Sequence, residues 1–279
     1  MKKQQRKQIA QETARILSQG YYTTPEGKHV DISEDLAHSC KETTVYTPAT
    51  LPKLLRKITS TKLPNRETKL EVTQESTLQA AQRLTFMGDA LCLNFASAKN
   101  PAGGFLNGAD AQEESLARAS GLYATLTTPQ AKQYYDANAA CNTNLYTDHI
   151  IFSPRVPVFR DEDGMLLEEP YYASFLTVPA VNKRAIERNE PHKSVTIEEV
   201  MRQRTQYLLA VAAEHEHNAL VLGAWGCGVF KNKPRDIARH FSEQLKGPFA
   251  GRFGKVVFAI VSHSDELAQV FRDALQVSA

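Results

Sequence analysis

Residues 90–114 decide the fold, and they read ALCLNFASAKNPAGGFLNGADAQEE. The first seven form a nearly continuous apolar run, which predicts a strand buried on both faces, as in a parallel sheet. A loop with paired glycines follows, and paired glycines let the backbone approach a ligand closely or adopt positive φ. The Gln-Glu-Glu at its end begins a helix that we expect from about residue 112 to 126. Acids in a first turn are ordinary partners of the helix dipole, so a functional role depends on the glycine loop beside them.

A second glycine-rich loop spans residues 222–234, which read LGAWGCGVFKNKP. It follows an apolar strand at 219–223 and precedes a helix with Pro234 near its first position. Successive backbone N–H groups in such a loop form an anion site, although the spacing matches neither the P-loop nor GxGxxG. Cys227 has no nearby histidine in the sequence to activate it, which favours a packing role. Phe230 is either a core residue or a ring that stacks on a base.

Strands and helices alternate over the rest of the chain. Further strands are expected at 70–73, 149–153, 174–179 and 256–261, with helices at 77–84 and 265–275 and a hairpin turn at Asp163-Gly164. Thr196 and Glu199 form a capping-box pattern at the start of a long helix. This order predicts an α/β fold with a mainly parallel sheet. Ligands of such sheets bind beyond the carboxyl ends of strands, where both glycine loops lie.

The first 66 residues have a different pattern. We expect a helix at 7–19, a hairpin at 21–32, and then irregular chain with one short helix near Leu54. We therefore predict an N-terminal extension, residues 1–66, packed on a main domain of residues 67–279.

Composition excludes several classes of protein. The chain has 279 residues, 42% of them hydrophobic and 23% charged, with a formal charge of +2. These values exclude a disordered chain and a strong field that would attract nucleic acid or membranes. The basic opening MKKQQRK is interpreted as a short tail. No apolar run approaches the ~20 residues of a membrane helix, and the N-terminal residues do not include the apolar core of a secretory signal peptide. We therefore expect a cytoplasmic protein. The four cysteines are far apart and indicate neither a disulfide framework nor a metal site.

Together the two loops resemble the macrodomain family, specifically the bacterial-type poly(ADP-ribose) glycohydrolases. That family's signature is three glycines followed several residues later by Gln-Glu-Glu. Here it appears as Ala102-Gly103-Gly104, seven residues, then Gln112-Glu113-Glu114. The stretch Gly226-Cys227-Gly228-Val229-Phe230 resembles the diphosphate-binding loop, and the likeness covers nearly the whole chain. Ala102 departs from the pattern. If its φ must be positive, its Cβ costs roughly 1–2 kcal/mol; otherwise it adds one methyl to a ribose pocket.

The resemblance implies a three-layer α/β/α sandwich with a mixed, mainly parallel sheet and an enzyme that cleaves ribose–ribose O-glycosidic bonds. ADP-ribose would leave from chain ends, by a single-glutamate mechanism through an oxocarbenium-like state. Glu114 would be the catalytic acid, Glu113 would orient the ribose and Gln112 would support the loop. No metal or cofactor is implied. The expected partners are ADP-ribose, poly(ADP-ribose) chains or ADP-ribosylated proteins, bound by a monomer. The remaining substrate contacts would be Asn94, Ala102, Gly103, Gly104 and residues 226–230, although Asn94 fits a satisfied strand-end amide equally well.

Helix geometry supports the use of a single carboxylate. Neighbouring helical residues point about 100° apart, so Glu113 and Glu114 cannot flank one bond as the two carboxylates of an ordinary glycosidase do. One of them must act as acid and then as base. We expect Glu114 to acquire its proton mainly in the complex.

Three alternatives stay open from the sequence. The first is a non-catalytic ADP-ribose reader, which would not need the Glu113-Glu114 pair. The second is a mono-ADP-ribosyl hydrolase acting on modified protein or nucleic acid. The third is an α/β protein whose glycine loops merely close turns.

Overall fold

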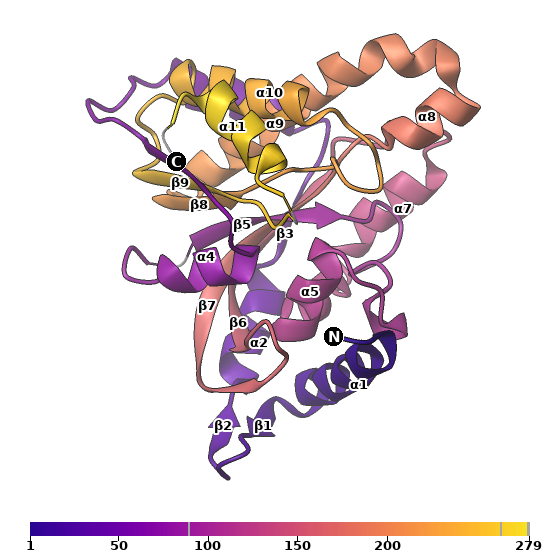
Figure 1. Ribbon diagram of the computed structural model, residues 1–279, viewed down its shortest axis with the longest axis vertical. Coiled ribbons are helices and arrows are strands. Elements are labelled where there is room, and N and C mark those ends of the chain that lie inside the picture. Colours follow the sequence, from indigo (N-terminus) through magenta and orange to yellow (C-terminus); the bar gives the residue numbers. More distant parts are fainter. Residues whose placement is uncertain (89, 263, 278–279) are drawn as a thin grey trace.

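The computed structural model describes residues 1–88, 90–262 and 264–277 (Figure 1). In these residues a seven-stranded sheet runs through the middle of the molecule. Its order is β3 (Thr44–Tyr46), β6 (Ile150–Arg160), β7 (Leu166–Pro179), β5 (Ala90–Ala96), β8 (Ala219–Leu222), β9 (Lys255–Ala259) and β4 (Lys69–Thr73). Strand β6 is antiparallel to β3 and β7, and the other neighbours are parallel. The predicted mixed, mainly parallel sheet is confirmed.

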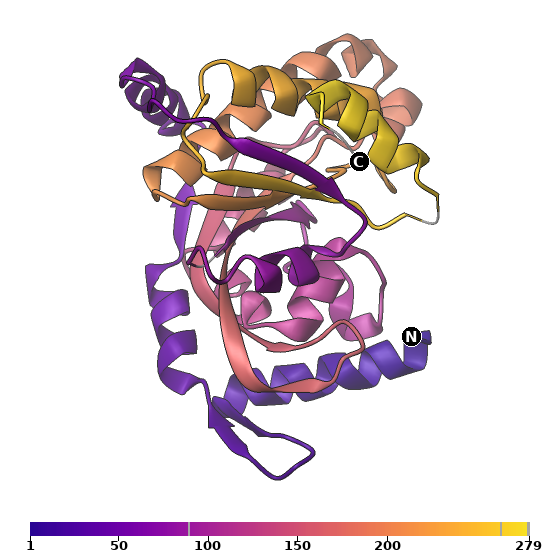
Figure 2. The same ribbon diagram turned by 60° about the vertical axis from the view of Figure 1, so that its left-hand side comes forward.

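Helices cover both faces of this sheet (Figure 2). One layer holds α3 (Leu51–Ser60), α8 (Lys183–Asn189), α9 (Ile197–Glu214), α10 (Pro234–Lys246) and α11 (Glu266–Leu275). The other holds α4 (Thr77–Arg83), α5 (Gln112–Ala119), α6 (Leu122–Leu126) and α7 (Lys132–Ala140). In β5, Leu91 and Leu93 pack in the first core while Ala90 and Cys92 pack in the second, because successive side chains of a strand face opposite ways. The predicted three-layer sandwich is confirmed.

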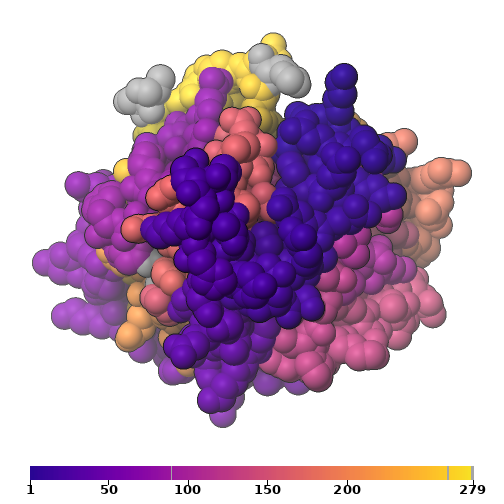
Figure 3. Space-filling model, turned by 90° about the horizontal axis from the view of Figure 1, so that it is seen from below, coloured from indigo at the N-terminus to yellow at the C-terminus, as the bar shows by residue number. Residues whose placement is uncertain are grey.

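Residues 3–42 wrap along the lower face of the molecule (Figure 3), whereas α3 lies in the upper layer (Figure 2). Helix α1 (Lys3–Gln19) lies against α5, where Thr13 Oγ1 donates to Arg118 O at 2.6 Å. The hairpin of β1 (Tyr21–Thr23) and β2 (His29–Asp31) is confirmed. However, β3 pairs with β6 and α3 packs in the first core, so the first 66 residues contribute to the central sheet. A domain boundary at residues 66 and 67 stays a prediction.

Several local expectations are wrong. Residues 33–42 form α2 (Ser33–Glu42), which packs on β6, rather than irregular chain. The basic opening is no free tail, since α1 begins at Lys3 and Arg6 Nε donates to Gly108 O at 3.0 Å. The expected helix at 112–126 is two helices, because Ser120 is extended and bridges to Val158.

The capping box at Thr196 is also wrong. Thr196 has helical backbone angles and continues from the 3-10 helix η2 (Pro191–Thr196) into α9, so its hydroxyl donates to Lys193 O at 2.8 Å instead of capping. A capping box does form at Ser76 and Gln79, at the start of α4. Among the helices of the described residues, none combines the length and the apolar composition that crossing a membrane requires.

Candidate active site

The glycine loop after β5 is attached to the sheet by Gln112, the first residue of α5. Strand β8 pairs with β5 only at Leu91 and Cys92, so the last residues of β5 have no strand on that side. The Gln112 amide takes the place of the missing strand. Its Oε1 accepts from Phe95 N at 2.9 Å and its Nε2 donates to Leu93 O at 2.8 Å. The predicted supporting role of Gln112 thus has a physical basis: it fixes the start of α5 against the carboxyl end of β5.

Glu113 is held beneath the loop and is almost fully buried. Its Oε2 accepts from Ser97 N at 2.7 Å and its Oε1 from Asn94 Nδ2 at 3.2 Å. Burial raises the pKa of Glu113 to about 8, although both hydrogen bonds act in the opposite direction. The charge of Glu114 adds to the rise. Asn94 also donates to Thr177 Oγ1 at 3.1 Å, so it serves as a fixed support for Glu113.

Glu114 is half-buried and reaches back over the glycine loop, where its Oε1 accepts from Gly104 N at 3.0 Å. The turn before it is left-handed at two successive residues, with φ of 56° at Ala102 and 57° at Gly103. A Cβ added to Gly103 would lie 2.4 Å from Glu114 Oε1 and 3.1 Å from Glu113 Oε2. Both carboxylates therefore lie against the same glycine, which leaves room for them only because it has no side chain.

The second glycine loop presents free backbone amides. Gly226 has φ of 72°, and a Cβ there would lie 2.5 Å from Ala180 Cβ and 2.6 Å from Asn232 Nδ2. Asn232 Nδ2 donates to Gly226 O at 3.1 Å and to Val181 O at 2.8 Å, which fixes the loop to the end of β7. Within the described residues, the N–H groups of Gly226 and residues 228–230 donate no hydrogen bond. Such a run of unpaired amides is a site for an oxyanion.

Cys227 is not a nucleophile in this arrangement. Burial raises the pKa of its thiol to about 12, and its Sγ lies 3.7 Å from Trp225 O. Because the thiolate is the reactive form, the side chain stays an inert thiol that packs against the core. The packing role predicted for Cys227 is in agreement with this environment.

The two loops line one cavity of about 1350 Å³. Of the residues predicted from the sequence, the cavity brings together Gly103, Gly104, Gln112, Glu113, Glu114, Gly226, Cys227, Gly228, Val229 and Phe230. Asn94 and Ala102 do not line it. Both are fully buried, Asn94 behind Glu113 and Ala102 in the core under the loop.

Other parts of the cavity wall were missed by the sequence analysis. Tyr146 lines it beside Phe230, with ring centroids 6.2 Å apart. A second apolar region comes from Phe95, Ile260, Val261 and Leu267, at the ends of β5 and β9 and on α11. Met1 and Ile9 border the far end together with the β6–β7 hairpin, so the cavity continues from Glu114 toward α1. A local signal existed for Phe95, Ser97, Ile260 and Val261, which lie at the carboxyl ends of predicted strands.

Comparison with known proteins identifies the family. A family model for the catalytic domain of microbial-type poly(ADP-ribose) glycohydrolase (PARG) matches residues 10–161. The crystal structure of PARG from Thermomonospora curvata is 47% identical, with a TM-score of 0.91, covering 97% of this chain and 99% of that one. The same enzyme bound to the inhibitor ADP-HPD has a TM-score of 0.88, at the same identity and coverage. PARG from Deinococcus radiodurans in complex with ADP-ribose is 43% identical, with a TM-score of 0.81, covering 86% of this chain and 96% of that one. No curated protein matches significantly.

Proposed function

This chain belongs to the microbial-type poly(ADP-ribose) glycohydrolase family, and we propose that Glu114 is the acid and base with which it cleaves ribose–ribose O-glycosidic bonds. The chain is a glycosidase, and the comparisons favour poly(ADP-ribose) hydrolysis over a pure reader or a mono-ADP-ribosyl hydrolase. One observation carries the assignment of residues: Glu114 and the unpaired amides of the second loop border a single cavity.

In the proposed complex the diphosphate lies on the amides of Gly226 and residues 228–230. The adjoining ribose is proposed to lie at Gly103, because both carboxylates lie against that glycine. Glu114 protonates the departing ribose oxygen while positive charge develops on the ribose that stays bound. It then removes a proton from the attacking water. Substrate that excludes water and brings negative charge favours protonation of Glu114, so the proton is taken up in the complex.

Glu113 orients the ribose in this proposal and takes no part in proton transfer. It is held by Ser97 and Asn94, and it is nearly closed off from solvent. Burial raises the pKa of Glu113, which favours its neutral form and so reduces the negative charge beside Glu114. A neutral carboxyl also donates a hydrogen bond, which suits a ribose hydroxyl.

The adenine has two apolar places available. One is Phe230, the predicted stacking partner, which lies beside Tyr146. The other is the wall of Phe95, Val261 and Leu267. If Phe230 stacks on the base, Phe230→Ala weakens binding of adenosine diphosphate as much as that of ADP-ribose. An effect on ADP-ribose alone would assign Phe230 to the ribose instead.

We further propose release from chain ends by a monomer in the cytoplasm, without metal and without sequence-specific binding of nucleic acid. The N-terminal helix supports the first point, since Met1 and Ile9 border the cavity beyond Glu114. In the described ranges no group of three or more His, Cys, Asp or Glu side chains is placed to hold a metal ion.

The deciding experiment compares Glu114→Ala with the wild type. Release of ADP-ribose from poly(ADP-ribose) is expected to fall by about 10²–10⁴-fold, the usual contribution of a general acid, while calorimetric binding of ADP-ribose is retained. Unchanged turnover would remove Glu114 from the mechanism. Mono-ADP-ribosylated protein is assayed beside free chains, and faster release from it would favour the mono-hydrolase. Wild type that binds ADP-ribose but releases none would favour a reader.

A further inference from the structure

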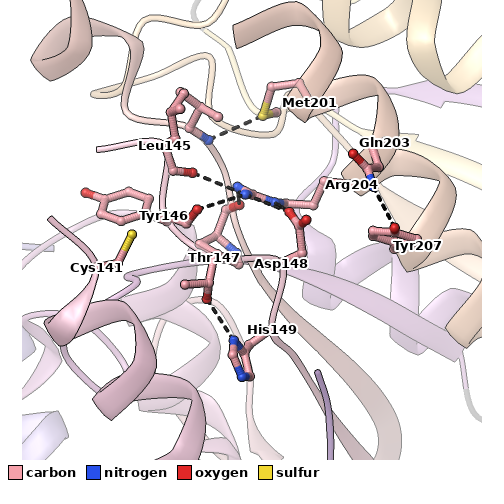
Figure 4. A network of polar contacts seen from close by, with 12 residues as sticks. Cys141, Leu145, Tyr146, Thr147, Asp148, His149, Met201, Gln203, Arg204 and Tyr207 are labelled. Carbon is pink, nitrogen blue, oxygen red and sulfur yellow. Dashed lines mark hydrogen bonds and ion pairs between the residues drawn. The ribbon is translucent and has the colours of Figure 1, made fainter. Parts of the chain in front are cut away.

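A buried arginine of α9 joins residues 145–148, which border the cavity through Tyr146, to the end of β7, which supports the amide loop. Arg204 does not itself line the cavity. Arg204 is fully buried, and its guanidinium points into the 145–148 segment (Figure 4). It donates to Asp148 Oδ1 at 2.9 Å and to three carbonyl oxygens, those of Leu145 at 3.1 Å, Tyr146 at 3.4 Å and Pro179 at 2.7 Å. Burying a charged group is costly unless hydrogen-bond acceptors surround it. The four acceptors therefore hold the Arg204 guanidinium in one position.

The first segment carries Tyr146, whose backbone is held in an unfavourable conformation. Its φ is 60°, a left-handed conformation that costs a residue with a side chain roughly 1–2 kcal/mol. Arg204 Nη2 binds the carbonyl oxygens of Leu145 and Tyr146, the two peptide groups that flank the Tyr146 Cα. The guanidinium therefore fixes the direction in which the Tyr146 ring enters the cavity, beside Phe230.

The second segment, at the end of β7, holds the loop with the free amides. Trp225 Nε1 donates to Val178 O at 3.2 Å, and Asn232 Nδ2 bridges Val181 O and Gly226 O. Helix α9 also contacts this segment one turn before Arg204, where Val181 N lies 3.3 Å from the sulfur of Met201. Through Pro179, the same guanidinium thus reaches the support of the amide loop.

We propose that Arg204 is a positioning residue that holds Tyr146 beside Phe230 and the rest of the amide loop, and so determines the affinity for ADP-ribose. The inference rests on the proposed function. Lysine cannot replace it, because four acceptors surround a planar fork that a single ammonium cannot reproduce. Arg204 makes no contact with the two carboxylates. Glu113 accepts hydrogen bonds from Ser97 and Asn94, and Glu114 accepts one from Gly104. Loss of the fork therefore changes KM much more than kcat.

The experiment measures ADP-ribose binding by calorimetry and ADP-ribose release from poly(ADP-ribose), below the Tm of every variant. Arg204→Lys is expected to raise Kd and KM at least tenfold and to keep kcat within about threefold. Tyr146→Ala is expected to raise Kd as well, and the double variant to raise it by less than the product of the two, because Arg204 acts through Tyr146. Arg272→Lys is the matched control. Arg272 is a buried arginine of α11 that bonds Asp265 and Gln269 and does not border the cavity, so Kd should stay unchanged.

A wild-type Kd in folded Arg204→Lys would overturn the proposal. So would a fall in kcat at unchanged KM, or multiplicative effects of Arg204→Lys and Tyr146→Ala. If Arg204→Lys does not fold, the test passes to Asp148→Asn, which changes one partly exposed acceptor and should raise Kd at least threefold. An unchanged Kd there would overturn the proposal equally. Failure of the wild-type protein to bind ADP-ribose would instead contradict the proposed function.

Discussion

Gly103→Ala tests how tightly the left-handed turn controls the catalytic carboxylate. At φ of 57° an alanine costs roughly 1–2 kcal/mol of backbone strain. The new Cβ would also lie 2.4 Å from Glu114 Oε1, where ordinary contact begins at 3.4 Å, so the oxygen must move by about 1 Å. That oxygen ends a flexible side chain. The clash is therefore relieved at little further cost to stability, but the relief breaks the bond to Gly104 N and moves the proposed acid.

The magnitude follows from that displacement. A misplacement of about 1 Å costs on the order of 100-fold in rate. We therefore expect kcat for ADP-ribose release from poly(ADP-ribose) to fall about 100-fold in a variant that remains folded by circular dichroism. A kcat within threefold of wild type would refute the argument that Gly103 makes room for Glu114.

Ala102→Gly is the matched control in the same turn. Ala102 has nearly the same φ, 56°, but its methyl is buried in the core and lies away from the cavity. Glycine removes roughly 1–2 kcal/mol of strain. Two effects of the glycine lower the stability. The loss of the buried methyl costs about 0.8 kcal/mol, and the greater conformational entropy of the unfolded chain costs about 0.5–1 kcal/mol. We expect little net change in stability and a kcat within about twofold of wild type. A large loss of activity would mean that the turn, rather than the Cβ at Gly103, controls the site.

Three further predictions concern pH and metal. Burial raises the pKa of Glu113 to about 8, whereas the carboxyl of the unfolded chain has a pKa near 4.5. The contribution of Glu113 to the free energy of unfolding therefore falls as pH rises between those values. Glu113→Gln should remove this contribution to the pH dependence, measured as the difference between urea melts at pH 5 and pH 8. Burial lowers the pKa of His215 to about 4, so between pH 6.5 and pH 4 this histidine is protonated in the unfolded chain but neutral in the folded protein. Stability present above pH 6.5 should then be lost as pH falls toward 4, and the loss should be smaller in His215→Gln. Prolonged dialysis against EDTA should leave ADP-ribose release unchanged, and a loss that Zn²⁺ or Mg²⁺ restores would contradict the metal-free mechanism.

Much of the site could be predicted because its requirements are local. A buried parallel strand, a turn with positive φ and the first turn of a helix each leave a mark within a few residues, and residues 90–114 contain all three in order. Asn94 also carried an unused signal. It shares the parity of Ala90 and Cys92, so its side chain had to face the layer that contains α5 and Glu113.

The missed elements depend on contacts between distant segments. Arg204 stands at helical spacing with Met201 and Leu208, so the sequence places it on the buried face of α9. Its acceptors come from residues 145–148 and 179, and only the tertiary structure brings them there. Tyr146 lies in a stretch without periodicity, and the carbonyl oxygen of this left-handed residue accepts from Arg204 of α9, which is distant in the chain. Helix α2 was missed because its packing face is narrow and rests partly on Ser39, whose hydroxyl donates to Arg155 O.

The positions of most strands along the chain, the two glycine loops and the carboxylate at the start of α5 were determined by the sequence, since backbone freedom and burial pattern act over short distances. Tertiary structure alone decided that Glu113 is buried and that Glu114 is only half-buried. It also decided which amides stay unpaired and which side chains complete the wall. These properties depend on desolvation and on hydrogen-bond partners far away in the chain, and both arise only when the sheet brings its strand ends together.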